Sequence, residues 1–421
     1  MSKYDIFVRD PLYGFIGLTS DEVKLIDTGI VQRLRRIKQL ANAHRVYPGA
    51  CHTRFEHSLG VMHIATRMAQ QLELSDDDIR TIRYASLLHD IGHGPFSHAF
   101  EEILSSVNGP AKVSHEDITR QIINSNEQIG QLLGDQTDEV LSLFSNATVS
   151  KEIISGNIDA DRLDYLRRDS YYTGVSYGEF DLERILHTIH NVNDGKRSYL
   201  TVLEKGMDAL ESFRLARFLM HSQVYSHHAR LICESMLQRA VEIAFRDEVL
   251  ERDLFKTTNK SFLENYLSLD DSRLIQKLLG TPTSNAYKLA NDLENRSLLK
   301  RGFELDLTQL TDAILKQKIT RMNPKNKKKL EEALAEECGC DKDFIIVSKI
   351  KIENSLFGLQ NDEDKIPILI EKKNGDIQQM DTISSLFGSW RPITKFFVFC
   401  PSEYRDKIQQ STETLLRETL I

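Results

Sequence analysis

The stretch LLHDIGHGPFSH, residues 87–98, places a histidine and an aspartate side by side at the end of an apolar run. Adjacent residues on a helix point about 100° apart, so His89 and Asp90 can bind one ion only if that ion lies near the helix end. Gly92 and Pro95 predict that the helix ends here. We therefore expect a metal ion at the end of a helix that Ser75 caps and Gly92 terminates.

Two further residues are candidate ligands for the same ion. These are His57, in RFEHSLG, and Asp161, in NIDADRLDYL. Neutral imidazole and carboxylate ligands suit divalent metals, and a set without cysteine argues against a structural zinc site. A His-Asp pair alone is usually incidental, but the full set is more specific. It predicts a catalytic divalent ion (Fe, Mn, Mg, Co, Ni or Zn) that keeps coordination positions open for water and substrate.

The bulk composition is that of an ordinary globular protein. The 421 residues are 40% hydrophobic and 28% charged, with a net charge of −8, which excludes a global attraction to nucleic acid or anionic membrane. No apolar run approaches the about 20 residues that span a bilayer. The five cysteines are scattered, and the N-terminus lacks a secretory pattern. We expect a cytoplasmic protein with no membrane partner, and nucleic acid is not a favoured one.

Hydrophobic periodicity predicts a mainly α fold. TGIVQRLRRIKQLANA, residues 28–43, reads as one helix, and a long helix is expected near 206–247. Asp194-Gly195 suggests a hairpin insert near 190–203. After residue 331 the pattern changes to strands around 343–352, 365–373 and 394–400, with Asn374-Gly375 as a turn. The predicted organisation is a helical core at 1–250, a helical extension at 251–330 and a small α+β region at 331–421.

Two helices carry polar residues at every fourth position. Side chains four apart share a helix face, and the two sets are Asp161, Tyr165 and Asp169, and Arg217, His221 and Tyr225. Such a stripe is either a solvated face or a pocket wall. As a pocket wall, Arg217 suits a polyphosphate, because guanidinium makes paired charge-assisted hydrogen bonds, and Tyr225 suits a sugar or base.

The motifs RFEHSLGV, HDIGHGPFSH and DADRLDYLRRD resemble the HD-domain metal-dependent phosphohydrolases. Among these the sequence is most similar to the deoxynucleoside triphosphate (dNTP) triphosphohydrolases. The resemblance implies an HD-domain helical bundle and hydrolysis of dNTP to deoxynucleoside and inorganic triphosphate. We expect no sterile-alpha-motif domain of the kind that vertebrate members carry.

The resemblance also implies substrate-binding roles. Positions that meet the triphosphate in similar enzymes match Arg54, Arg217 and His221, and we add Arg162, where family members often carry lysine. Positions that surround the deoxyribose match Gln39, Leu40, Tyr165, Asp169 and Tyr225.

The leaving 5′-oxygen needs a proton, and His98 is the predicted general acid because imidazole titrates near neutral pH. Glu101, three residues later, is expected to orient it, although relatives often carry aspartate there. His93 and His115 are expected to contact phosphate or solvent in the same cavity.

A second nucleotide site is expected on the segment that contains Asp27, Gln32 and Arg35. From the residues alone this is a solvated helix face. The resemblance implies that these positions read guanine and phosphate of a dGTP or GTP effector at a subunit interface, in a homo-oligomer that we expect to be a tetramer.

Two other functions stay open from the sequence. The same metal site would serve a nucleotide phosphatase or phosphodiesterase, and a non-catalytic protein would use the pocket to bind nucleotides or single-stranded nucleic acid.

Overall fold

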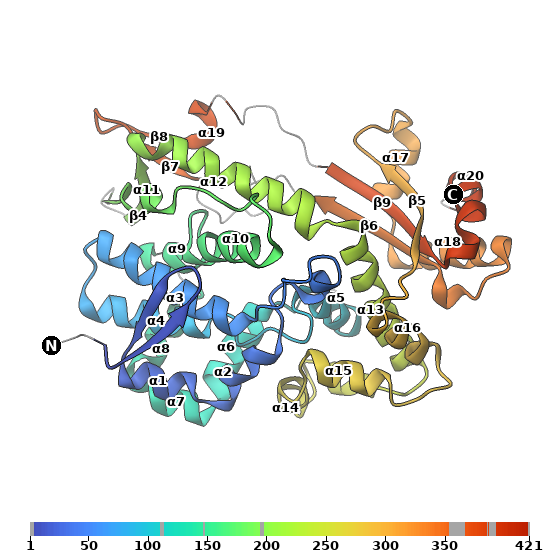
Figure 1. Ribbon diagram of the computed structural model, residues 1–421, viewed down its shortest axis with the longest axis horizontal. Helices are drawn as coiled ribbons and strands as arrows, with labels where there is room; N and C mark the ends of the chain where they lie inside the picture. The colour runs from blue at the N-terminus through green and yellow to red at the C-terminus, as the bar shows by residue number, and fades with distance from the viewer. Residues whose placement is uncertain are drawn as a thin grey trace. The chain divides into compact units, whose positions relative to one another are not determined.

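A computed structural model describes residues 4–109, 113–145, 148–193, 198–352, 367–384, 386 and 393–419. Helices dominate, which confirms the mainly α prediction (Figure 1). The chain divides into two compact units, the first from residues 1–220, 255–271 and 355–389, and the second from 221–254, 272–354 and 390–421. The sequence predicted three consecutive segments, at 1–250, 251–330 and 331–421. This division stays a prediction, because compact packing does not show which segments function independently.

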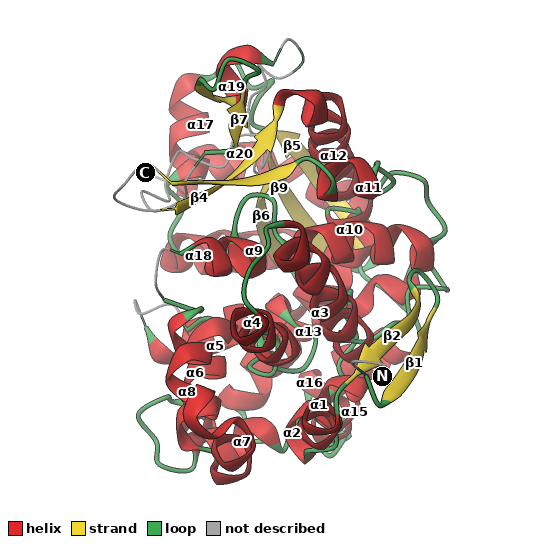
Figure 2. Ribbon diagram, turned by 90° about the vertical axis from the view of Figure 1, so that its left-hand side faces the viewer, coloured by secondary structure: helices red, strands yellow, loops and turns green. Residues whose placement is uncertain are grey.

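Three helices form the centre of the first unit (Figure 2). α3 (Arg54–Gln71) packs against both α4 (Asp76–Leu88) and α10 (Ala160–Thr173). The hydroxyl of Ser75 accepts a hydrogen bond from the Asp78 backbone N–H at 3.1 Å, so Ser75 caps α4 as predicted. The unit also contains α1 (Ser20–Ile26), α2 (Gly29–Arg33), α5 (His98–Asn108), α6 (His115–Ser125), α7 (Glu127–Leu133), α8 (Thr137–Ser142), α9 (Val149–Ser155), α11 (Leu182–Leu186), α12 (Met207–Met220), α14 (Phe262–Leu267) and α19 (Met380–Ile383).

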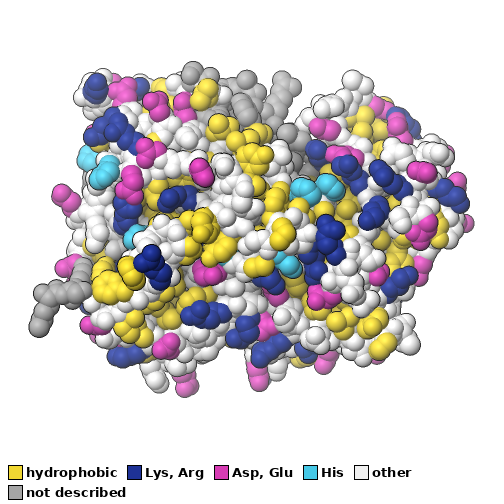
Figure 3. All heavy atoms as spheres, viewed as in Figure 1, with side chains coloured by type: hydrophobic (Ala, Val, Ile, Leu, Met, Phe, Trp, Pro, Cys, Tyr) yellow, Lys and Arg dark blue, Asp and Glu magenta, His cyan; other side chains and the backbone are white. Residues whose placement is uncertain are grey.

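The described strands of the first unit form two sheets. β1 (Ile6–Asp10) and β2 (Gly14–Leu18) make an antiparallel hairpin, and hydrophobic side chains gather over it on the face shown in Figure 3. The second sheet has the order β3 (Ile189–Asn193), β4 (Ser198–Leu203), β7 (Leu369–Glu371), β8 (Ile377–Gln379).

β3 and β4 pair antiparallel, as the expected hairpin requires, while its turn at 194–197 lies outside the described residues. β7 and β8 are joined through Asn374-Gly375, where Gly375 has a φ of +86° that favours glycine. β4 and β7 pair in parallel, so the strand predicted around 365–373 belongs to this sheet.

The single helix predicted at residues 28–43 is wrong. α2 ends at Arg33, a short 3₁₀ turn (Leu34–Arg36) follows, and a second 3₁₀ segment spans Ala41–Arg45. Between them an isolated antiparallel bridge pairs Lys38 with Thr53. Next to it, the Gln39 N–H donates to His52 O at 3.1 Å, and the Arg54 N–H donates to Ile37 O at 3.0 Å. These long-range hydrogen bonds replace those of a continuing helix.

The long helix predicted near 206–247 is also interrupted. α12 ends at Met220, a π-helical turn spans His221–Tyr225, and α13 (His228–Arg246) follows in the second unit. A π turn inserts an additional residue, so the four-residue spacing from Arg217 to Tyr225 no longer defines one α-helical face.

Gly92 has a different role from the predicted helix stop. α4 ends at Leu88 with His89 as its C-cap. A Cβ at Gly92 would lie 2.1 Å from the carbonyl oxygen of His115. The absence of a side chain at Gly92 therefore lets the start of α6 approach the HD-containing turn.

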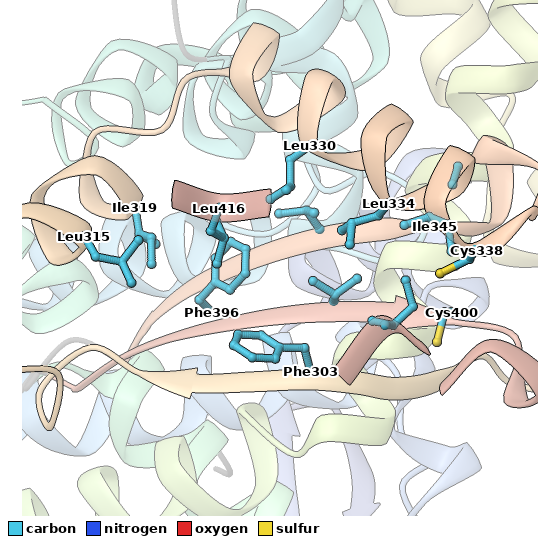
Figure 4. Close-up of a cluster of buried hydrophobic side chains, with 14 of the residues drawn as sticks. Phe303, Leu315, Ile319, Leu330, Leu334, Cys338, Ile345, Phe396, Cys400 and Leu416 are labelled. Carbon is cyan, nitrogen blue, oxygen red and sulfur yellow. The ribbon is translucent and has the colours of Figure 1, made fainter. Parts of the chain in front are cut away.

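The second unit contains an antiparallel sheet with the order β5 (Lys300–Asp306), β9 (Ile393–Cys400), β6 (Ile346–Ile352). The sequence analysis predicted strands at the positions of β6 and β9, but it did not predict β5. Its other helices are α15 (Asp271–Leu278), α16 (Asn285–Glu294), α17 (Ala313–Thr320), α18 (Pro324–Cys338) and α20 (Arg405–Thr419). Phe303 and Phe396 from the sheet pack with Leu330 and Leu416 from the helices (Figure 4). No described helix combines the length and apolarity that a bilayer crossing needs.

Gly60 permits the close packing of α3 on α10. A Cβ there would lie 2.0 Å from Asp164 Oδ1 and 2.4 Å from Arg168 Nη2. We predict that Gly60→Ala destabilises the protein by about 1–3 kcal/mol, because a fully buried ion pair cannot make room for a methyl group. The midpoint of urea unfolding, followed by circular dichroism, measures the effect.

Gly130→Ala is the matched control. Gly130 lies inside α7, and no heavy atom would come within 4 Å of the added Cβ. Alanine is the better helix former, so this variant should be more stable by up to about 1 kcal/mol. Equal unfolding midpoints for the two variants would contradict the packing argument.

Candidate metal centre and active site

Three of the four predicted metal ligands meet at one point of the first unit. His57 lies in the first turns of α3, His89 is the C-cap of α4, and Asp90 follows it. One ligand atom from each lies within 4.8 Å of the other two. The end of α4 thus brings two adjacent side chains to one position, as the sequence argument requires.

The environment of His89 suits a metal ligand. Its Nδ1 lies 2.7 Å from the carbonyl oxygen of Ser86, which fixes the ring and the tautomer. Its Nε2 is buried, makes no hydrogen bond to the described residues, and lies 3.3 Å from Asp90 Oδ1. A buried imidazole lone pair facing a carboxylate fits a divalent cation between them.

Asp161, the fourth predicted ligand, approaches the cluster from the first turn of α10. Its Oδ1 lies 2.9 Å from His57 Nε2, while Asp164 Oδ2 lies 2.8 Å from His57 Nδ1. Burial alone would lower the pKa of His57, but the hydrogen bonds to Asp161 and Asp164 outweigh it and raise that pKa to about 10. Without a metal, the imidazole therefore carries a proton between two carboxylates.

Asp164 was missed by the sequence analysis. Besides His57, it accepts hydrogen bonds from the Arg168 guanidinium at 2.8 and 2.9 Å and from the Tyr13 hydroxyl at 2.8 Å. Arg168 also pairs with Asp10 of β1 at 2.9 Å. The signal in the sequence was the four-residue spacing of Asp164 and Arg168, which places both side chains on one helix face and allows an ion pair.

Arg54, expected at the triphosphate, pairs with a predicted metal ligand. Its Nη1 lies 2.6 Å from Asp90 Oδ2, and its Nε donates to the Ser97 hydroxyl at 2.8 Å. Burial would raise the pKa of Asp90, but the charge of Arg54 outweighs burial and holds that pKa well below its usual range. Asp90 is therefore ionised and ready to bind a cation.

A second cluster contains the predicted acid–base residues. Ligand-type atoms of His93, His98, Glu101 and His115 lie within 4.8 Å of one another, a set that would also suit a cation. Glu101 Oε1 is the common partner, 3.0 Å from His98 Nδ1, 2.9 Å from His115 Nδ1 and 3.5 Å from His93 Nδ1. His93 Nε2 lies 3.3 Å from Asp90 Oδ1, so Asp90 connects the two clusters.

The surroundings shift the pKa values of two imidazoles of this cluster in opposite directions. Burial, Arg54 and His115 hold the pKa of His93 well below its usual value, so His93 is neutral. Burial opposes protonation of His115 too, but its hydrogen bond to Glu101 raises its pKa. The side chain of His98 is 67% exposed, which leaves it accessible to a ligand.

The turn that holds His93 is fixed from outside the cluster. Arg33 Nη1 donates to the carbonyl oxygen of His93 at 2.8 Å and Arg33 Nε donates to that of Leu269 at 2.8 Å. The Tyr266 hydroxyl donates to Gly92 O at 2.7 Å. Arg33 belongs to α2, so the segment with the expected effector residues is hydrogen-bonded to the acid–base cluster.

The predicted sugar and phosphate residues are only partly brought together. Asp169 and Tyr165 lie on α10 with Asp161, and Gln39 and Leu40 lie on the segment that pairs with residues 52–54. The guanidinium of Arg162 donates to Gly156 O and to Asp159. Arg217 lies on α12. Burial raises the pKa of the Tyr165 phenol, and the charge of Arg217 opposes this shift. His221 and Tyr225 belong to the second unit, and their rings are in edge-to-face contact, with centroids 4.9 Å apart.

The expected effector residues occupy the surface near α2. Arg35 Nε donates to Gln32 Oε1 at 2.9 Å, and Gln32 Nε2 donates to Ile26 O at 3.0 Å. Asp27 is exposed at the end of α1. Their assignment to a nucleotide site stays a prediction.

Comparison with known proteins identifies the family. A model of the HD domain matches residues 54–169, and a model of the HD-associated region matches residues 180–418. The chain belongs to the HD-domain family. The expected resemblance is confirmed at this level, and both clusters lie within the HD match.

Relatives cover most of this HD-domain chain. The uncharacterized protein YwfO of Bacillus subtilis is 31% identical over 92% of this chain and 90% of its own. A Dictyostelium discoideum homolog of the deoxynucleoside triphosphate triphosphohydrolase SAMHD1 is 29% identical over 71% of this chain and 60% of its own. A crystal structure of a phosphohydrolase from Bacteroides thetaiotaomicron has a TM-score of 0.75 at 28% identity, covering 94% of this chain and 99% of that one. HD-domain proteins bind divalent metal, and the cluster of His57, His89 and Asp90 fits one.

Metal uptake should release a proton from His57. Its imidazole binds metal only when neutral, and its pKa near 10 means that it is protonated at pH 7 in the metal-free protein. The apparent affinity should therefore rise by up to about tenfold per pH unit below pH 10. Titration of metal-free protein with Mn²⁺, by calorimetry in two buffers of different ionisation enthalpy, gives the proton count.

His63→Ala is the control for this count. Burial lowers the pKa of His63 to about 4, so it is already neutral at pH 7, and the variant should release as many protons as the wild type. A wild-type count near zero at pH 7 would show that His57 is not protonated as inferred.

Proposed function

We propose that this HD-domain phosphohydrolase converts dNTP and water to deoxynucleoside and inorganic triphosphate. The observation that carries the proposal is the pair of clusters joined at Asp90: a set of cation ligands next to an exposed imidazole held by a carboxylate. Hydrolysis at the α-phosphorus requires both functions within one site. The dNTPase named among the relatives supports the choice of substrate.

Attack by water and departure of the 5′-oxygen occur on opposite sides of the α-phosphorus. A divalent ion held by His57, His89, Asp90 and Asp161 would supply Lewis-acid activation of phosphate and water. Arg54 keeps Asp90 ionised and oriented, and in our proposal it also faces the triphosphate. Arg162, Arg217 and His221 offset phosphate charge as it redistributes.

His98 donates the proton to the leaving 5′-oxygen. Its Nδ1 lies 3.0 Å from Glu101, so the proton available for transfer is on Nε2. Glu101 positions His98 and His115 together, and His93 and His115 face the phosphates. The proton transfer spares the enzyme from expelling a free alkoxide.

The sugar is recognised by Gln39, Leu40, Tyr165, Asp169 and Tyr225. A close tyrosine excludes the 2′-hydroxyl sterically, and a packed wall leaves that hydroxyl without a partner, which costs about 1–3 kcal/mol.

We further propose that Asp27, Gln32 and Arg35 bind dGTP or GTP between subunits of a homotetramer. In the same proposal, residues 1–250 form the catalytic core, residues 251–330 a helical extension and residues 331–421 a C-terminal region.

Product analysis tests the reaction. Incubation with each dNTP and NTP, with Mn²⁺ or Fe²⁺ and with or without dGTP, should release intact triphosphate from dNTPs only. Ion-exchange chromatography separates triphosphate from pyrophosphate and phosphate. Release of single phosphates would favour a nucleotide phosphatase, and binding without turnover would favour a non-catalytic nucleotide-binding protein.

Loss of either of two ligands should abolish turnover. We predict that His89→Ala and Asp161→Ala each reduce triphosphate release to below about 1% of wild type, because each variant removes one side chain that would bind the ion directly. His187→Ala, at an exposed histidine of the same unit, should retain activity. Wild-type turnover in either ligand variant would refute the assigned ligand set.

The general-acid role of His98 predicts a dependence on the leaving group. His98→Asn should slow dNTP hydrolysis by about 10²–10⁴-fold. The loss should be much smaller with p-nitrophenyl triphosphate, because nitrophenolate leaves without a proton. An equal loss on both substrates would show that His98 serves binding rather than proton transfer.

A further inference from the structure

His52 forms a buried pair with Asp169. His52 Nε2 lies 2.8 Å from Asp169 Oδ1, and the two side chains are 0% and 2% exposed. Neither the metal cluster nor the acid–base cluster contains His52. Because a carboxylate only accepts hydrogen bonds, Nε2 carries the proton and donates it to Asp169.

The surroundings hold the His52 ring in this orientation. Its ring stacks on that of Tyr172, with centroids 4.5 Å apart and planes at 14°. A Cβ at Gly49 would lie 2.5 Å from the carbonyl oxygen of Tyr172, so the loop before His52 packs directly on the last turn of α10. The position of Asp169 is therefore set by a residue from a different part of the chain.

His52 also connects Asp169 to Gln39. The carbonyl of His52 accepts the Gln39 N–H at 3.1 Å. The side-chain Oε1 of Gln39 is buried and accepts no hydrogen bond from the described residues. A buried acceptor without a donor costs about 1–3 kcal/mol, which a ligand donor would relieve.

We propose that His52 is a positioning residue for recognition of the sugar 3′-hydroxyl, an inference that rests on the proposed function. The sugar of a dNTP has one free hydroxyl, which donates one hydrogen bond. Gln39 Oε1 and the Asp169 carboxylate are acceptors on the two segments that His52 joins. By fixing Asp169, His52 determines where that hydroxyl must lie.

Two substitutions separate this role from packing. In His52→Gln, the amide nitrogen lies about where Nε2 was and keeps the donor to Asp169. His52 Nδ1 makes no hydrogen bond to the described residues, so its loss removes no hydrogen bond. In His52→Asn the shorter amide cannot reach Asp169. Both variants remove the imidazole stack on Tyr172.

The measurement is kcat/KM for dTTP divided by kcat/KM for ddTTP, which lacks the 3′-hydroxyl. The wild type and His52→Gln should give similar ratios. His52→Asn should lower the ratio about tenfold, mainly through a higher KM for dTTP, with ddTTP turnover nearly unchanged. An unchanged ratio in His52→Asn, or an equal collapse in both variants, overturns the proposal.

Failure of the proposed function is detected separately. If the wild type releases no triphosphate from any dNTP, calorimetric titration with thymidine and 2′,3′-dideoxythymidine replaces turnover. A wild-type preference for thymidine that His52→Asn loses and His52→Gln keeps supports the proposal, and a wild type without this preference overturns it. His63→Gln, which changes a histidine stacked on Tyr13, controls for stability and should leave either ratio unchanged.

Discussion

The buried carboxylate of Asp164 is the constraint on which the site depends. An ionised carboxylate inside a protein costs several kcal/mol unless its oxygens are fully paired. Asp164 is paired with His57 of α3, Arg168 of its own helix α10, and Tyr13 of the turn between β1 and β2. One of these donors is His57, whose Nδ1 is consequently occupied. Its Nε2 is thereby directed at Asp161. The closeness of α3 and α10 at Gly60 is a condition of this arrangement, because any larger side chain would occupy the place of the carboxylate.

Charge is distributed so that each cluster keeps one acid ionised. Asp90 is held by Arg54, and Glu101 is held by His98 and His115, so neither needs a metal to stay deprotonated. The same oxygen of Asp90, Oδ1, lies next to His89 of the metal cluster and next to His93 of the acid–base cluster. A change of charge in one cluster therefore alters the electrostatic potential at the other cluster, because both contact the same carboxylate in an interior where electrostatic interactions are weakly screened.

Helix ends and residue types were enough to predict the mainly α fold and the grouping of His89 with Asp90. The errors have a common physical origin. After Arg33 the apolar spacing fits a helix, but backbone pairing between residues 37–39 and 52–54 is a long-range contact that local periodicity does not record. The π turn after Met220 is likewise decided by tertiary context. His52 pairs with Asp169, which is distant in sequence, so no local pattern marks it. The spacing of Asp164 from Arg168 is local, but the contacts of Asp164 with His57 and Tyr13 are not.

The parallel pairing of β4 with β7 has a consequence for biosynthesis. Thr201 pairs with Leu369, and 369 − 201 = 168 residues separate them. At about 5–20 residues per second, a ribosome needs roughly ten to thirty seconds to make the intervening chain. During that time the hairpin of β3 and β4 presents an open strand edge, the kind of surface on which nascent chains aggregate. Translation speed downstream of residue 201 thus sets how long this edge waits for its partner.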